Sequence, residues 1–251
     1  MDPSLAVLRP FGRAQDLELE FANGNRPALV TALLDHCSDA PGPDYWWNQT
    51  VGVRIAALLR VLALTEGNER AISAMLRCTK PQCGETFEVE LSVGDLLPAQ
   101  PAGNVAAAEP IAISLQTGRS ALLRRPTGRD LGNWRAFHHA TRGEAIAAMI
   151  NELLIDGSID PDDEPMVAEV MAEHDPLIAF AVACTCPVCG ADSEKRIDLE
   201  EIVLARLNAR QRALLREVHV LASRYGWSER EILGIAPARR ARYLQMIEEG
   251  P

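Results

Sequence analysis

The spacing of apolar residues changes along the chain and predicts the kind of element that each stretch forms. Between Val51 and Leu64 apolar residues recur every three or four positions, with Arg54 and Arg60 off the stripe, which predicts a helix. A shorter apolar stretch, Ala28 to Leu34, predicts another helix nearer the N-terminus. The first part of the chain is therefore expected to be largely helical.

After residue 70 the period of the pattern becomes two. Apolar and polar side chains alternate over 72–78 and again over 87–93, which predicts two strands. A second pair of short segments, Ile111 to Leu115 and Ser120 to Leu123, predicts another hairpin. Two further strands are predicted later in the chain, at Leu177 to Cys184 and Glu194 to Leu199.

Between these strands, and after them, the pattern is again helical. Thr127 with Asp130 and Thr141 with Glu144 form capping-box patterns that predict the starts of two helices, and a third helix is expected through Met166. From residue 200 to the end, three helices are predicted. The first carries a long apolar stripe, the second begins with a cap formed by Ser228 and Glu231, and the third opens at Pro237. The stripe consists of Leu207, Leu214, Val218, Leu221 and Tyr225.

Five of the six cysteines lie in two clusters that repeat one another. Cys78-Thr-Lys80-Pro-Gln-Cys83-Gly84 aligns with Cys184-Thr-Cys186-Pro-Val-Cys189-Gly190, with five of seven positions identical. The similarity continues downstream without a gap, and an apolar strand enters each cluster. The sequence therefore predicts two related units, each a strand, a cysteine turn and a strand.

Each unit is typical of half a zinc ribbon, because proline fixes one φ, glycine permits left-handed backbone, and both thiolates face one point. The expected ligands of a closed structural Zn²⁺ site are Cys78, Cys83, Cys186 and Cys189. Cys184 is the alternative for one of them, because Lys80 stands where Cys186 stands in the other cluster. Reduced cysteines of a degenerated site, and redox chemistry through Cys186-Pro-Val-Cys189, remain open as alternatives.

The predicted fold class is α+β, with a zinc-ribbon-like β unit, inserted helices and a C-terminal helical module. The expected parts are an N-terminal helical and irregular segment at 1–50, a zinc-ribbon-like core at 51–199 with a helical insertion at 127–174, and the helical module at 200–251. Hydrophobic residues at 47% and charged residues at 24% fit a globular protein.

Net charge and the lack of known catalytic motifs reduce the number of functions to consider. The net charge of −10 opposes general binding to nucleic acid or anionic membranes, and no apolar run is long enough to span a bilayer. The N-terminus has no secretory pattern, so a cytoplasmic location is expected. No phosphate-binding loop or hydrolase motif occurs, and the pair His138-His139 lacks a carboxylate at a matching spacing, so no enzyme is expected.

The C-terminal module is the expected partner surface, because its apolar stripe is longer than the two short helices can cover. Trp227 stands at a rigid corner and is a favourable anchor, although it could instead close the core of the module itself. The residues expected to bind a partner are Trp227, Leu214, Val218, Leu221, Arg239 and Arg240. Residues 225–243 also resemble a short helix-turn-helix, which leaves nucleic acid as an alternative ligand that Glu229 and Glu231 disfavour.

Several motifs together resemble one family. They are Tyr45-Trp46-Trp47-Asn48, Cys83-Gly-Glu-x-Phe-Glu-Val, Pro126-Thr127-Gly128, the Cys-Pro-x-Cys-Gly turn, and above all Leu214-Leu-Arg-Glu-Val-His219 with Tyr225-Gly-Trp-Ser-Glu229 and Arg239-Arg240-Ala-Arg242-Tyr-Leu244. From about residue 45 the chain resembles the baseplate hub proteins and hub assembly chaperones of T-even-like contractile phage tails and related bacterial contractile injection systems.

This resemblance implies a non-enzymatic, zinc-binding structural protein or assembly chaperone that contacts baseplate hub or spike proteins. It would act in the cytoplasm or be incorporated into the phage-like particle. The alternative function from another class is a nucleic-acid-binding regulator built from a zinc ribbon and a helix-turn-helix.

Overall fold

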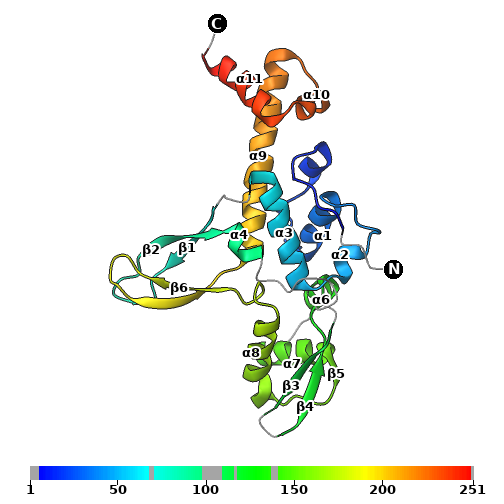
Figure 1. Ribbon diagram of the computed structural model, residues 1–251, viewed down its shortest axis with the longest axis vertical. Helices are drawn as coiled ribbons and strands as arrows, with labels where there is room; N and C mark the ends of the chain where they lie inside the picture. Colours follow the sequence, from blue (N-terminus) through cyan, green and yellow to red (C-terminus); the bar gives the residue numbers. More distant parts are fainter. Residues whose placement is uncertain (1–5, 68–70, 98–108, 116–117, 137–140, 250–251) are drawn as a thin grey trace.

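The computed structural model describes residues 6–67, 71–97, 109–115, 118–136 and 141–249. These residues form a mixture of helices and small antiparallel sheets, which confirms the predicted α+β class. Four parts are visible in Figure 1: a helical body, a lobe below it, a β arm to the left and a pair of short helices at the top.

The helical body contains α1 (Arg26–His36), α3 (Val51–Glu66) and the first half of α9 (Leu199–Tyr225). Their apolar side chains share one large core with those of the segment before residue 50. The expected boundary at residue 50 therefore does not separate two structural units, because the segments on both sides of it bury side chains in this core.

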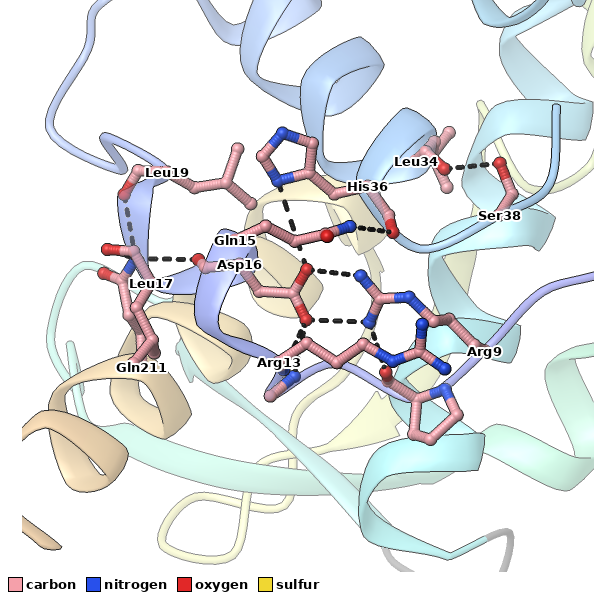
Figure 2. Close-up of polar contacts among 12 residues, drawn as sticks. Arg9, Arg13, Gln15, Asp16, Leu17, Leu19, Leu34, His36, Ser38 and Gln211 are labelled. Carbon is pink, nitrogen blue, oxygen red and sulfur yellow. Dashed lines mark hydrogen bonds and ion pairs between the residues drawn. The ribbon is translucent and has the colours of Figure 1, made fainter. Parts of the chain in front are cut away.

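Hydrogen bonds tie the N-terminal segment to α9 as well. The carboxylate of Asp16, in the short helix η1 (Ala14–Glu18), is fully buried and accepts two hydrogen bonds from Arg9, at 2.6 and 2.8 Å. Gln211 of α9 donates to the carbonyl oxygens of Asp16, Leu17 and Leu19, as Figure 2 shows. The buried amide thus connects the N-terminal segment to α9.

The sequence places Arg54 off the apolar stripe of α3, but the structure buries its side chain completely. Its guanidinium donates to the carbonyl oxygens of Trp46 and Pro27, both at 2.8 Å, and to the Thr31 hydroxyl at 3.0 Å. Trp46 belongs to α2 (Tyr45–Asn48). Arg54 therefore joins α1, α2 and α3 from inside, and burial lowers its pKa to about 10.

The lobe has its own small core, formed by three antiparallel strands and two helices. Its elements are β3 (Ile111–Ser114), β4 (Ser120–Leu123), α7 (Arg142–Leu153), β5 (Leu154–Asp156) and α8 (Glu164–His174), with the one-turn helix η3 (Pro161–Asp163) before α8. The expected helical insertion at 127–174 matches this lobe only in part. Its first helix, α6 (Gly128–Trp134), instead packs against α1 and α2 in the helical body.

The arm consists of two hairpins, labelled in part at the left of Figure 1. One pairs β1 (Ala71–Arg77) with β2 (Thr86–Ser92), and the other pairs β6 (Ala181–Thr185) with β7 (Asp192–Arg196). The predicted strand at Leu177 to Cys184 begins later, because 176–178 form a turn. The predicted strand at Glu194 to Leu199 ends earlier, because Leu199 already begins α9. A short helix, α4 (Val93–Leu96), follows β2.

At the top of Figure 1, α10 (Glu229–Gly234) and α11 (Pro237–Glu249) pack against α9. Ser228 and Glu231 form the predicted capping box at the start of α10. Within the described ranges, no helix combines the length and the apolar character that crossing a membrane requires.

Candidate metal centre

The four cysteines predicted as ligands converge at one point where the two hairpins of the arm meet. Their four sulfur atoms all lie within 4.8 Å of one another. Cys78 Sγ is 3.6 Å from Cys189 Sγ, and Cys83 Sγ is 3.8 Å from Cys186 Sγ. Each short distance joins one hairpin to the other, so the centre connects parts of the chain about a hundred residues apart.

This spacing fits a single tetrahedral metal ion. Metal–sulfur bonds of about 2.3 Å place the sulfur atoms at the corners of a tetrahedron whose edges are about 3.8 Å. Cys78 and Cys186 are buried and the other two ligands are half-buried. The four cysteines could therefore hold a metal ion, in an arrangement compatible with structural zinc.

The backbone of both turns supports the site. The N–H of Cys78 donates to Glu85 O at 2.8 Å, and the N–H of Cys186 donates to Ala191 O at 2.9 Å. Each turn closes with a left-handed glycine, Gly84 at φ +58° and Gly190 at φ +65°, as the sequence predicts. These matched hydrogen bonds show that Cys78 is structurally equivalent to Cys186.

This equivalence corrects the sequence alignment of the two clusters. In the sequence alignment Lys80 stands at the position of Cys186, which suggests a missing thiolate in the first turn. The ladders show instead that the first turn is two residues longer, because Arg77 pairs with Thr86 before the turn begins, as Thr185 pairs with Asp192. Both turns therefore supply two thiolates.

Cys184 lies outside the sulfur cluster. It precedes Cys186 by two positions, as Leu76 precedes Cys78, and both side chains pack against the main core. The Cys184 thiol donates to the carbonyl oxygen of Ser193 at 3.4 Å. It is therefore a core residue of β6, not an alternative ligand.

The electrostatic environment differs among the four thiols. Backbone N–H groups of Cys189 and Val188 point at Cys186 Sγ and lower its pKa to about 7. At Cys83 the N–H of Glu85 also favours the thiolate, but burial and the neighbouring thiols prevail and raise its pKa to about 12. Four thiolates at this distance repel one another, and a divalent cation between them offsets that repulsion.

Sequence reasoning did not identify Arg77 as a residue that supports the site. Its Nε donates to the carbonyl oxygen of Gly84 at 3.1 Å, next to the ligand Cys83. The side chain thus braces the longer first turn. Its place at the end of an alternating strand, one residue before Cys78, was the available signal.

The predicted partner residues of the C-terminal module are mostly turned inward. Leu214 and Leu221 are fully buried, and Val218 is half-buried. Arg240 is 4% exposed and pairs with Glu217 through a 2.9 Å contact. Leu214 packs in the main core of the helical body, and Arg240 connects α11 to α9 through Glu217. These two side chains and Leu221 are covered by the chain itself.

Trp227 and Arg239 have different surroundings. Trp227 is half-buried, stacked on Tyr225 at 4.5 Å and set edge-on to Tyr243 at 5.1 Å between ring centroids. It closes the aromatic cluster of its own module, which was the alternative role. Arg239 is exposed. The pair His138-His139 lies outside the described residues.

Comparison with known proteins assigns no relative to the chain: no family model, curated protein or solved structure matches it. The function must therefore be inferred from the site and its surroundings.

Removal of the Cys184 thiol separates the two roles considered for it. We expect Cys184→Ser to keep the full metal content, whereas Cys78→Ser loses it, because only Cys78 has its sulfur in the cluster. Metal per chain, measured by mass spectrometry of each purified variant, tests this. Equal metal loss in the two variants would return Cys184 to the ligand set.

Proposed function

We propose that this chain is a non-enzymatic structural protein whose β arm is held by one Zn²⁺ ion bound to Cys78, Cys83, Cys186 and Cys189. The observation that carries the proposal is the convergence of four sulfur atoms at tetrahedral spacing. Four thiolates fill the coordination sphere of zinc, so substrate would find no open position on the metal. The ion would act by joining two hairpins.

The position of the centre explains why such a join would matter. β1 and β2 follow α3, whereas β6 and β7 lead directly into α9. The two hairpins form separate sheets with no strand pairing between them among the described residues. A metal at the cysteine turns would therefore fix the end of the arm and hold the two halves together.

We further propose that the protein is a component or assembly chaperone of the baseplate hub in a contractile phage-like tail or injection system. The support is the resemblance of its motifs from residue 45 onward. Two physical features agree with such a role: a rigid metal-stapled arm, and a long helix α9 that extends beyond the helical body (Figure 1). The expected partners are hub or spike proteins.

Deletion of the encoding gene in the producing cells tests this function. We expect contractile particles to be absent or to lack a closed baseplate in electron micrographs, and plasmid-borne wild-type protein to restore them. Peptides of this chain in purified restored particles would identify a permanent component, and their absence would identify a chaperone. Normal, active particles in the deletion strain would contradict both roles.

The nucleic-acid regulator is the competing outcome. Arg240 is engaged by Glu217, which leaves fewer arginines for phosphate contacts than the sequence suggested. Binding to a DNA duplex that falls steeply with salt would support the regulator. The structural role predicts no duplex binding at about 0.1 M salt.

A further inference from the structure

The C-terminal module differs in charge from the rest of the protein. Residues 200–251 contain nine arginines and seven glutamates, whereas the remainder contains 16 basic and 28 acidic residues. The module is thus slightly basic on an acidic protein. Such a separation of charge favours a partner of opposite sign at the basic end.

The arginines of α9 divide into two groups by direction. Arg206 pairs with Glu66 at 2.9 Å, and Arg210 pairs with Glu217 at 3.3 Å. Arg212, Arg216 and Arg224 are exposed and form no ion pair with any described residue. The first group forms ion pairs that stabilise the fold, whereas the second group forms none within the described part of the chain.

Apolar side chains lie between these outward arginines. Leu215 is 43% exposed and Val220 is 36% exposed. Exposed positions on this side recur at intervals of three and four residues along the helix: Glu201, Ala205, Ala209, Arg212, Leu215, Arg216, His219, Val220, Ser223 and Arg224. They form one continuous face, which we call the outer α9 face.

The lower end of the outer α9 face is hollowed. Two adjoining hollows of about 290 and 680 Å³ lie between α9 and the loop after η1, and both are lined by Phe21, Asn23 and Asn208. Arg212 lines the upper one. The face therefore begins as a groove and continues as an open helix surface over about 35 Å of helix axis.

We propose that the outer α9 face docks an amphipathic helix of a partner protein, with acidic side chains flanking its apolar stripe. Arginine forms bidentate pairs with carboxylates, and Leu215 and Val220 supply apolar contact between those pairs. The choice of a protein as partner rests on the proposed function, which this inference deepens by naming the surface and the chemistry that it binds.

The outer α9 face replaces the partner surface expected from the sequence. The inward stripe with Leu214 and Leu221 is buried against other parts of the chain, Leu214 in the main core, so a partner could reach it only by displacing them. The face on the opposite side of the same helix needs no such rearrangement. Burial of the apolar stripe agrees with the helical period of the sequence, because the apolar side of an amphipathic helix packs against a core.

The binding test uses a synthetic 24-residue amphipathic helix with leucines on one face and flanking glutamates, labelled for fluorescence anisotropy, and a twin with lysine in place of glutamate. We expect the full-length protein to bind the acidic peptide at least about tenfold more tightly than the basic twin. Arg212→Glu/Arg216→Glu should weaken that binding at least about tenfold, because two attractive charges become repulsive. Leu215→Ser should weaken it about threefold.

The matched control is Arg60→Glu/Arg142→Glu, which makes the same charge change at exposed positions of α3 and α7. It should retain binding within about twofold, because local pairing outweighs net charge at moderate salt. Metal content and circular dichroism of all variants should match the wild type, since the substituted side chains are exposed.

Four results would overturn the proposal. Three concern binding: equal binding of the two peptides, equal effects of the two double variants, or tighter binding to a DNA duplex than to the acidic peptide. The fourth is self-association that Arg212→Glu/Arg216→Glu abolishes in sedimentation, which would assign the face to a second copy. Particle loss in the deletion strain is independent of these results. Failure of the docking surface is therefore distinguishable from failure of the hub role.

Discussion

Cys186→Ser/Cys189→Ser is expected to reduce bound zinc from about one ion per chain to less than about a tenth, because two of the four thiolates are removed. The melting temperature should fall by more than about 10 °C, since a metal that binds only the folded state adds its binding free energy to stability. Metal analysis and calorimetry of the same preparations measure the two effects.

A matched control for this variant lies in the same hairpin. Thr185→Ser/Val188→Ser changes two exposed neighbours of the ligands and should keep the zinc and the melting temperature. A strong chelator should bring the wild-type protein to the melting temperature of the cysteine variant. Wild-type protein that contains almost no metal, or a cysteine variant as stable as the wild type, would refute the structural zinc.

Gly128→Ala is expected to destabilise the protein by about 1–3 kcal/mol, because the new methyl group would meet a buried guanidinium that three hydrogen bonds hold in place. A Cβ at Gly128 would lie 1.7 Å from one terminal nitrogen of Arg54 and 2.5 Å from its Cζ. Arg54 is held by three hydrogen bonds and is fully buried. Urea unfolding monitored by circular dichroism measures the change.

Gly143→Ala is the natural comparison, because Gly143 also lies in the first turn of a helix and has open space around its Cα. It should be neutral or stabilising by up to about 1 kcal/mol, since alanine favours helix and restricts the unfolded chain. Adding Arg54→Leu to Gly128→Ala should cost less than the sum of the single effects, because the clash is then absent. Equal effects of the two glycine substitutions would show that the body tolerates a displaced Arg54.

Much of the local structure follows from the sequence because it depends on neighbouring residues. The three capping boxes that begin with Thr127, Thr141 and Ser228 are all present with both reciprocal hydrogen bonds. The alternating segments around the first cysteine turn form the predicted hairpin, and in its first strand the predicted apolar positions are the buried ones. Side-chain caps and strand alternation are set within a few residues, so the printed order of residues suffices to find them.

The four metal ligands could also be predicted, because two similar turns of opposite hairpins supply sulfur atoms in a recognisable spacing. The reason for the different cysteine spacing in the two turns could not be predicted. In an alignment, a two-residue insertion in the first turn looks the same as the replacement of a cysteine ligand by Lys80. Only the hydrogen bonds of Cys78 with Glu85 and of Cys186 with Ala191 distinguish the two cases.

Tertiary structure alone decided what covers the apolar stripe of α9. Leu214 packs in the main core with side chains of the N-terminal segment and the helical body, whereas α10 and α11 pack against the later part of the helix. Arg54 is charged and still enters the core, because carbonyl groups from α1 and α2 meet there and need a donor. Such outcomes depend on groups brought together from distant parts of the chain, and periodicity in one segment carries no information about them.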